Sequence, residues 1–419
     1  MKANLTLLFL SVLFSLFVVN AVLEFVSSTQ DSKLDRVTAL EMESKISGVS
    51  SDLREKMQVV DDLRSRGQKA YPSAYTHHYL EEMRDDQKGA AGAFVPLGMK
   101  SHTQYVLCNE LGQWAVFDYD RHGFNNDDAV YDLKNTGASD KVILIGDSFV
   151  EGQCVQKGED MASRLRQKGI GAISLGMGGS GPLRELGVLK EYGLKLNPSV
   201  VVWFFTEMND LDDLASETKD VFLRRYLTPN FSQNLIDRQD EIDKTWESFI
   251  EEKISEKKID DTKKQKTTFS LMSSLKSYLT FYQLRKRLSL VRRNLVIQGN
   301  LTKFKEVLSQ VVELTSDNHI RLVFIYLPSR TGFSNNGDDI RKSIKVIVGE
   351  LGISFIDMKE IFAKSGRNPV SYFPVPPILH HYTPEGYQTV ADEVASYLRS
   401  NHLLSDVPGA LPAGVGNFH

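Results

Sequence analysis

The feature that most constrains the fold is a repeated alternation of short apolar runs and helical segments that begins at Lys141. Unbroken runs of Val, Ile and Leu bounded by glycine are typical of strands that are covered on both faces. Strands that alternate with helices in this way predict a parallel sheet with helices packed on both sides. The successive segments are "KVILIG", a helix over 161–168, "GAISL", a helix from Pro182, "SVVVWFF", "RLVFIYLP", a helix over 341–351, "ISFID" and a helix over 384–399.

The composition is that of a globular chain. Of its 419 residues, 25% are charged and 41% are hydrophobic, which is enough to build one large core or two modest ones. The formal net charge of -4 gives no reason to propose nucleic acid as a partner. The basic clusters lie among acids or at helical spacing, so they are interpreted as solvated faces. Nothing in the sequence indicates an oligomeric state.

The chain divides into four predicted stretches. Residues 1–27 form an export segment, 28–135 a helical arm followed by a small strand-rich segment, 136–402 the α/β domain, and 403–419 a tail. Within the domain, residues 211–315 are charged and helical, and they are too long and too periodic for a loop. This helical insertion is either a lid over the strand ends or a structural flap.

The amino terminus predicts export. An apolar run from Leu5 to Val26, interrupted only by Thr6, two serines, Asn20 and Glu24, approaches the roughly 20 residues that span a bilayer. It is either a transmembrane signal anchor or a signal peptide cut after Ala21, and we favour the anchor because the run is long for a signal peptide. Both interpretations place the remaining chain on the extracytoplasmic side, in a periplasmic or extracellular location, and the anchor makes the membrane a partner.

The chain has two cysteines, Cys108 and Cys154. In an exported protein an even pair predicts one disulfide, and here the bond would brace the loop that follows Ser148. The alternative is two buried thiols.

Polar residues follow the predicted strands at the points where the strands end. Ser148 follows the first strand, "GMGGSG" the second and "TEMND" the third, while "HHYTPEGY" opens the last helix. The carboxyl ends of parallel strands share one edge of a sheet, where ligands bind in open α/β folds. A serine, glycine amides, an asparagine and a histidine at one site are the groups that acyl transfer needs. Taken alone, Ser148 is equally well explained as a helix cap.

The blocks "GDSFVEG", "GMGGSG", "EMND" and "HYTPEG", in this order, resemble the four blocks of the SGNH hydrolase superfamily, the GDSL esterases and lipases. The likeness covers 141–399. The longer contexts "DRHGFNNDD" and "GSGPLRELGVLKEYGLKLNPSVVVWFF" are similar to a membrane-anchored bacterial subgroup of that superfamily. The resemblance implies a flavodoxin-like, three-layer α/β/α domain with a parallel sheet.

The resemblance also implies roles for residues that match the blocks. Ser148 is expected to be the nucleophile, with its own N–H as one oxyanion donor. Gly179 is expected to supply a second N–H, and Asn209 a side-chain amide. His381 is expected to be the general base, and its neighbour His380 is the alternative. No metal and no organic cofactor is required.

Two departures from the family pattern stand out. The family usually has an aspartate two or three residues before the histidine, where this chain has Leu379 and Ile378. Either a backbone carbonyl completes a Ser-His dyad, or a carboxylate from another loop, such as Asp357 or Asp210, orients the imidazole. The second departure is Glu207, which stands where the third block often has glycine and is expected to narrow the pocket or repel anionic substrates.

The expected function is an exported serine hydrolase acting on small acyl esters by Ser-His catalysis. Its substrate is an ester-bearing small molecule, glycan or lipid, with O-acetyl groups on cell-surface or extracellular polysaccharide favoured, and acyl transfer in place of hydrolysis remains open. The alternative is an SGNH-fold scaffold with little or no activity that binds glycans or protein partners.

Other classes fit the residues less well. "GMGGSG" matches the G-x-G-x-x-G dinucleotide fingerprint, and Glu207 ends the next strand as a ribose-binding acid would. That fingerprint normally opens the first strand-helix unit, whereas here "KVILIGDS" precedes it. Adjacent His380 and His381 lack the i, i+4 spacing of a zinc-binding helix. An α/β-hydrolase elbow needs G-x-S-x-G, and "GDSFV" lacks the second glycine.

Overall fold

The computed structural model describes residues 36–83, 93–132, 138, 140–264, 282–333, 338–375 and 379–405, together with residues 11, 15, 18 and 19. The chain divides into two compact units. The first comprises Met1–Thr38 and Glu251–Gly299, and the second comprises Ala39–Ile250 and Asn300–His419. The site described below lies in the second unit.

The core of the second unit is a five-stranded parallel sheet. Its strands are β4 (Lys141–Ile145), β5 (Gly171–Ser174), β6 (Val200–Thr206), β7 (Arg321–Leu327) and β8 (Ser354–Asp357). They lie in the order β5-β4-β6-β7-β8, and every neighbouring pair is parallel. This is the flavodoxin-like strand order. The predicted parallel α/β domain is therefore confirmed.

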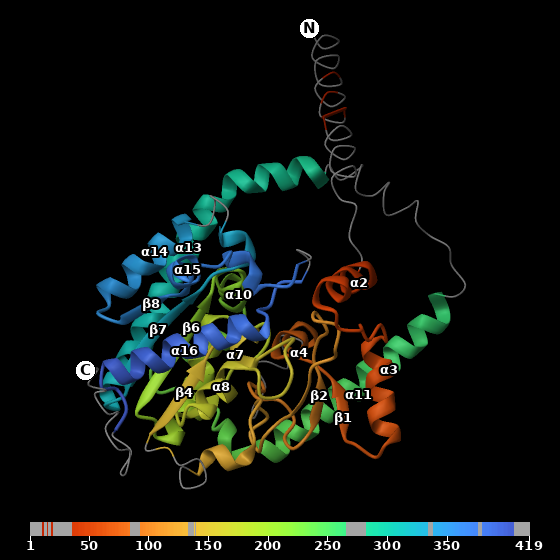
Figure 1. The fold of residues 1–419 in the computed structure, drawn as a ribbon, viewed down its shortest axis with the longest axis horizontal. Helices are drawn as coiled ribbons and strands as arrows, with labels where there is room; N and C mark the ends of the chain where they lie inside the picture. The colour runs from red at the N-terminus through yellow and green to blue at the C-terminus, as the bar shows by residue number, and fades with distance from the viewer. Residues whose placement is uncertain are drawn as a thin grey trace, which may run out of the picture. The chain divides into compact units, whose positions relative to one another are not determined.

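One face of the sheet is covered by helices α8, α15 and α16 (Figure 1). Alternate side chains of the strands, such as Leu144 and Val202, share a core cluster with Leu165 of α8, Phe362 of α15 and Val390 of α16. The helices of this domain are α7 (Ser148–Glu151), α8 (Met161–Gln167), α9 (Pro182–Val188), α10 (Asp210–Glu217), α13 (Tyr282–Asp317), α14 (Asp338–Glu350), α15 (Met358–Lys364) and α16 (Pro384–Ser400).

The intervening side chains point to the opposite face, as the period of a strand requires. There Phe304 of α13 packs edge-on against Phe205 and Phe324, at ring-centroid distances of 5.2 and 6.1 Å. Lys305 on the same helix pairs with Glu350 of α14. Residues on this stretch of α13 thus belong to the crossover between β6 and β7, and the domain has three layers.

A small second sheet precedes this domain. It contains β1 (Ala70–Pro72), β2 (Gln104–Val106) and β3 (Val116–Asp118), with β1 parallel and β3 antiparallel to β2. The hairpin loop between β2 and β3 is closed by Leu107 N–H donating to the Ala115 carbonyl. The helices here are α2 (Arg36–Ser47), α3 (Lys56–Ser65) and α4 (Thr76–Glu82), and α11 (Gln239–Lys264) follows later in the chain.

Short helical turns connect these elements. The 3₁₀ turns are η1 (Asp128–Tyr131), η3 (Leu194–Leu196), η4 (Leu223–Leu227), η5 (Leu235–Asp237), η6 (Arg330–Phe333) and η7 (Pro369–Tyr372), and η2 (Leu189–Gly193) is a π-helical turn.

The "DRHGFNNDD" segment forms hydrogen bonds to the carboxyl end of β5 and to the turn that follows β4. Asn125 Nδ2 donates to the Glu151 carbonyl at 2.7 Å. Asn126 makes a two-way pair with the backbone of Ser174, donating to its carbonyl at 2.8 Å and accepting from its N–H at 2.9 Å. Asp120 accepts from Asn126 in turn, so this segment fixes the turn behind Ser148 to β5.

Among the described helices, none has both the length and the apolar character needed to cross a bilayer. The predicted anchor, residues 1–27, lies outside the described residues except at positions 11, 15, 18 and 19, and the predicted tail is described only as far as residue 405.

The packing of α13 yields a test. Phe304 is fully buried, so Phe304→Ala is expected to lower the free energy of unfolding by about 3–5 kcal/mol through lost contacts and a residual cavity. Urea unfolding followed by circular dichroism measures it. The control is Val346→Ala on α14, where the side chain is 58% exposed and the expected change is within about 0.5 kcal/mol. Equal effects of the two substitutions would contradict the described packing.

Candidate active site

Ser148 is the first residue of α7 and lies just past the carboxyl end of β4. The preceding Asp147 caps this short helix by accepting from Phe149 N–H at 3.0 Å, and it also accepts from the Thr206 hydroxyl at 3.0 Å. Gly146 is required before it, since an added Cβ would lie 2.5 Å from a Val150 methyl. Strand end, cap and glycine together hold Ser148 in a sharp turn.

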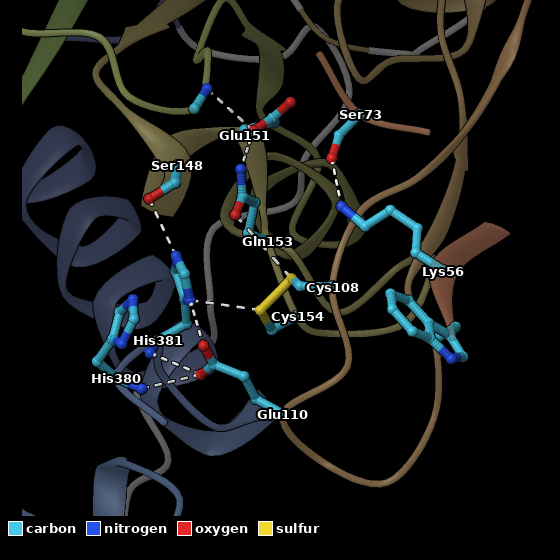
Figure 2. The surroundings of a disulfide bond; sticks show 12 residues. Lys56, Ser73, Cys108, Glu110, Ser148, Glu151, Gln153, Cys154, His380 and His381 are labelled. Carbon is cyan, nitrogen blue, oxygen red and sulfur yellow. Dashed lines mark hydrogen bonds and ion pairs between the residues drawn. A yellow bond between two sulfur atoms is a disulfide. The ribbon is translucent and has the colours of Figure 1, made fainter. Parts of the chain in front are cut away.

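His381 brings an imidazole to this serine from a segment 233 residues away in sequence (Figure 2). Its Nε2 lies 3.0 Å from Ser148 Oγ. Both side chains are buried, with exposed fractions of 6% for His381 and 8% for Ser148. His380 is half-buried, and its ring lies beside that of His381 at 4.8 Å between centroids. The ring that reaches the serine is that of His381.

Glu110, a residue that the sequence analysis did not single out, completes the arrangement. Its Oε1 lies 3.0 Å from His381 Nδ1, while its Oε2 accepts from the backbone N–H groups of His380 and His381, each at 2.9 Å. A carboxylate accepts only, so the proton of the neutral imidazole is placed on Nδ1. This leaves the Nε2 lone pair to accept from the Ser148 hydroxyl.

The buried pair shifts both pKa values in the direction of ionisation. Burial by itself lowers the pKa of His381, but the charge and hydrogen bond of Glu110 outweigh it, so the pKa is raised above 6.5. Burial by itself raises the pKa of Glu110, and the imidazolium outweighs it, so that pKa is lowered. Such a pair stabilises the imidazolium that forms when the ring accepts a proton.

Asp357 and Asp210, which the sequence suggested for orienting the imidazole, have other partners. A Ser-His dyad completed by a backbone carbonyl does not describe the site either, because Nδ1 of His381 faces Glu110. Asp357 pairs with Arg341 at 2.7 Å and caps α15. Asp210 accepts from Thr206 N–H at 2.7 Å. The missed residue had a signal in the sequence. Glu110 is two positions from Cys108, whose expected disulfide partner is six positions from Ser148.

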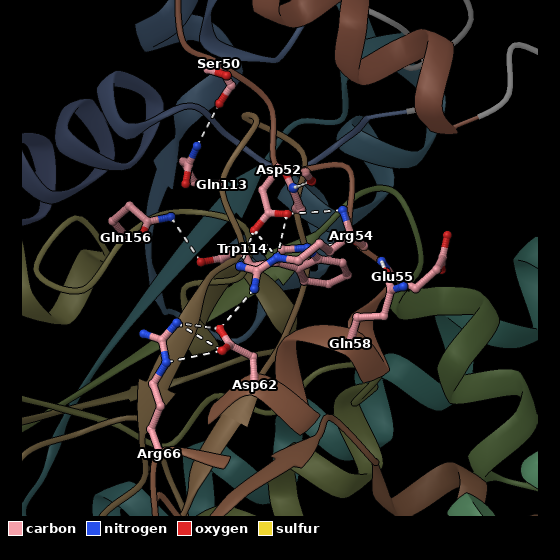
Figure 3. A network of polar contacts seen from close by, with 11 residues as sticks. Ser50, Asp52, Arg54, Glu55, Gln58, Asp62, Arg66, Gln113, Trp114 and Gln156 are labelled. Carbon is pink, nitrogen blue, oxygen red and sulfur yellow. Dashed lines mark hydrogen bonds and ion pairs between the residues drawn. The ribbon is translucent and has the colours of Figure 1, made fainter. Parts of the chain in front are cut away.

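The hairpin loop that carries Glu110 is held by the N-terminal segment (Figure 3). Asn109 and Gln113 donate to the carbonyls of Asp52 and Ser50 at 2.8 and 2.7 Å. Trp114 Nε1 donates to the Arg54 carbonyl at 3.1 Å, and the Arg54 side chain is itself held between Asp52 and Asp62. The strand-rich segment before the α/β domain is thus the support for a group of the candidate site.

The other side of this loop is tied to the serine turn by a disulfide between Cys108 and Cys154, which confirms the expected bond. Cys154 has a left-handed backbone, with φ of 67°. Its sulfur lies 3.3 Å from His381 Nδ1. Glu110, Cys154 and His381 gather three residue types that bind metals, but this sulfur is bonded to Cys108 and is no thiolate ligand.

Gly179 and Asn209 follow β5 and β6, the two neighbours of β4, at the same edge of the sheet. Gly179 has a φ of 65°, and an added Cβ would lie 2.6 Å from the His77 ring. Asn209 Nδ2 donates to Asp213 Oδ2 at 2.7 Å, and a side-chain hydrogen bond from Asn209 favours the ionised form of Asp147. Gly179 thus lies against His77 and Asn209 donates to Asp213, whereas Ser148 and His381 are joined directly.

Glu151 orders the glycine turn. Its carboxylate accepts from Gly178 N–H at 3.0 Å and from Gln153 Nε2 at 2.6 Å, and Tyr119 donates to it as well. Burial raises the pKa of Glu151 to about 7, against the lowering effect of these donors. Glu151, the last residue of α7, thus holds the backbone of Gly178, the residue before Gly179.

The glycines of "GMGGSG" are explained by this packing. A Cβ on Gly176 would lie 2.4 Å from Glu151 N, and one on Gly178 would lie 2.4 Å from Gln153 Nε2. The first N–H groups of α9, which would hold a pyrophosphate in a dinucleotide fold, donate instead to Glu217: Gly181 N at 2.7 Å and Leu183 N at 3.0 Å. The dinucleotide interpretation therefore has no support at this turn.

Glu207 also has a structural partner. Its carboxylate accepts from the backbone N–H and the hydroxyl of Ser329 at 2.9 and 3.0 Å. An added Cβ on Gly332 would fall on the same carboxylate. Glu207 thus ties the loop after β6 to the loop after β7.

No family model matches the chain. No curated protein matches it either. Among solved structures, the chain is similar to a lipase/acylhydrolase from Enterococcus faecalis at 12% identity, with 62% of this chain and 96% of that chain covered and a TM-score of 0.35. It is also similar to an acetyl-xylooligosaccharide esterase from Geobacillus Stearmophilus at 15% identity, with 63% and 94% covered and a TM-score of 0.34. Likenesses at this level carry no argument about function.

The Glu110–His381 pair predicts a shifted titration. We expect a pKa of His381 above its ordinary value in the wild type and a lower one in Glu110→Gln, because the substitution removes the charge that opposes desolvation. Imidazole NMR of the full-length chain measures both values, with His381→Gln identifying the signal. His122, whose pKa is lowered to about 4 by burial, is the internal control and should keep the same pKa in both proteins. An unchanged pKa of His381 in Glu110→Gln would contradict the pairing.

The disulfide predicts a loss of stability on removal. It closes 46 residues of sequence, and a constraint of that size on the unfolded chain is worth up to about 4 kcal/mol. The double substitution Cys108→Ser, Cys154→Ser is therefore expected to lower the free energy of unfolding by about 2–4 kcal/mol in urea. An unfolding midpoint equal to that of the oxidised wild type would show that the bond contributes nothing.

Proposed function

We propose that this protein is a serine hydrolase of acyl esters. The observation that carries the proposal is the unbroken hydrogen-bonded chain from Ser148 Oγ through the two nitrogens of His381 to Glu110. A nucleophile within reach of a base, whose ring is oriented by a buried carboxylate, is the arrangement that activates a hydroxyl for attack on a carbonyl. A purely structural scaffold has no need for a buried, oriented imidazole at a serine.

In the proposed reaction, Ser148 Oγ attacks the ester carbonyl carbon while His381 Nε2 takes the hydroxyl proton. The carbonyl oxygen becomes an oxyanion, for which we assign the N–H groups of Ser148 and Gly179 and the amide of Asn209 as donors. The imidazolium then gives its proton to the leaving alcohol as the C–O bond breaks. Water, activated by His381, attacks the acyl-enzyme and releases the acid and Ser148.

Glu110 has a positioning role in this mechanism. It holds the imidazole in the tautomer that can accept from Ser148, and it stabilises the imidazolium in both steps. Its presence removes the main reason for preferring a scaffold, which was the absence of a carboxylate just before the histidine. The carboxylate of Glu207 is engaged with the backbone N–H and the hydroxyl of Ser329.

We further propose an extracytoplasmic location, with residues 1–27 as the membrane anchor. The disulfide supports this proposal, because such bonds persist in oxidising compartments and are rare in the cytosol. Small acyl esters of extracellular or cell-surface polysaccharide remain the favoured substrates. Hydrolysis and transfer of the acyl group share the same first step.

The test is hydrolysis of p-nitrophenyl acetate by the full-length chain in detergent. Ser148→Ala is expected to lose about 10³-fold or more in kcat, because the nucleophile is gone. Ser343→Ala is the matched control, since its hydroxyl only donates to the Asp339 carbonyl within α14, and it should match the wild type.

Labelling by a fluorophosphonate probe gives a second readout that needs no correct substrate. The wild type is expected to gain one covalent adduct on Ser148, and Ser148→Ala none. A folded wild type that neither hydrolyses p-nitrophenyl esters nor reacts with the probe would refute the proposed function.

A further inference from the structure

A cleft of about 450 Å³ lies beside the proposed oxyanion donors and has no role in the mechanism above. Its size is within the range of ligand pockets. Helices α4, α9 and α10 and the turn after α10 form its walls.

The cleft shares two walls with the candidate active site. His77 lines the cleft, and its ring lies against Gly179, where a Cβ would meet it at 2.6 Å. Asp213 also lines the cleft and accepts from the amide of Asn209 at 2.7 Å. Two of the three proposed oxyanion donors, Gly179 and Asn209, thus each have a neighbour in the cleft, which places the cleft next to these donors.

The wall formed by α9 and α10 is fixed by a buried ion pair. Arg184 Nε donates to Glu217 Oε1 at 2.5 Å, and both side chains are only 3% exposed. Glu217 also accepts from the N–H groups of Gly181, Leu183 and Arg184, which locks the start of α9 onto α10. This wall is built before any ligand arrives, so it restricts what the cleft accepts.

The chemistry of the lining selects against two classes of ligand. A long acyl chain would cover charged groups such as Glu81, Asp213 and Lys219 with hydrocarbon and leave them without water, which is costly. An anionic group would meet more acids than bases, because Glu81, Asp213, Glu217 and Asp220 outnumber Arg184 and Lys219.

A neutral group rich in hydroxyls fits the same lining. A hydroxyl both donates and accepts, so it can bond to carboxylates and to an ammonium. The imidazole of His77 is neutral, since burial, with Arg184 and His78 adding to it, lowers its pKa to about 3. Val221, which is 61% exposed, offers apolar surface to the C–H groups of a ring, beside the buried Leu80 and Leu223.

We infer that this cleft binds the saccharide part of the ester that Ser148 opens. The inference rests on the proposed function and adds to it the place and the residues that recognise the sugar. The acyl group then lies on the other side of the reacting carbonyl, away from the cleft.

The experiment fills the cleft. Ser216 is an exposed residue of its lining, and Ser216→Trp places an indole there. Ser255→Trp on α11 is the matched control, because both serines are exposed and both donate their hydroxyl to the carbonyl four residues earlier. Values of kcat/KM are measured for the full-length chain on methyl 6-O-acetyl-glucoside, p-nitrophenyl acetate and p-nitrophenyl octanoate.

Ser216→Trp is expected to lower the ratio of kcat/KM for the acetylated glucoside to that for p-nitrophenyl acetate by 10-fold or more. Ser255→Trp is expected to leave the ratio as in the wild type. An unchanged ratio in Ser216→Trp would overturn the inference. So would a selective loss of activity on the octanoate, which would assign the cleft to the acyl chain.

A binding measurement separates this inference from the proposed function. Calorimetric titration of Ser148→Ala with the same acetylated glucoside requires no turnover, and we expect binding that is weakened at least 10-fold when Ser216→Trp is added. Binding lost in this way from a protein that hydrolyses no ester would uphold the sugar site and reject the hydrolase. Ester hydrolysis by the wild type without binding of the glucoside would uphold the hydrolase and reject the sugar site.

Discussion

The candidate site depends on one buried carboxylate that makes two kinds of contact at once. Glu110 uses one oxygen for the imidazole of His381 and the other for the backbone of the segment that carries it. The first contact selects the tautomer and the second fixes the position of the ring. A buried charge is tolerated only when it is paired and hydrogen-bonded, and here both conditions are met within two residues. The loops around it, the disulfide and the Arg54 network can be understood as means of keeping that carboxylate in place.

Other buried carboxylates belong to the loops around Ser148, and they are less fully paired and hydrogen-bonded than Glu110. Asp147 and Glu151 are satisfied mainly by backbone N–H groups and neighbouring side chains. Glu185 and Asp210 are fully buried, and burial raises their pKa well above the ordinary range, with neighbouring acids adding to the effect. Such a cluster costs folding free energy. Proteins accept this cost mainly near functional sites, where a fixed arrangement of polar groups is worth more than maximal stability.

Much of the fold could be predicted from the sequence, because each strand after Lys141 is a short apolar run with a clear end. The parallel sheet, the helix positions and the convergence of Ser148 and His381 follow from that pattern and from the order of the blocks. Gly179 and Asn209 could be placed at the correct edge of the sheet, but their neighbours His77 and Asp213 could not. Glu110 was missed for a physical reason. It lies in a hairpin loop whose pairing is set by long-range contacts, and periodicity carries no information about such contacts. Only the two cysteines linked that loop to the serine turn.

Glu110 and His381 are 271 residues apart in sequence, so the candidate site needs a longer stretch of chain than the five-stranded sheet does. The stretch that resembles the hydrolase superfamily starts at Lys141, and an excised domain cut there would keep every strand of the five-stranded sheet. It would nevertheless lack the orienting carboxylate, the sulfur that binds Cys154 and the α4 wall of the cleft. In this protein the boundary of the sheet and the boundary of the candidate site do not coincide, so a fragment that folds well would still lack part of that site.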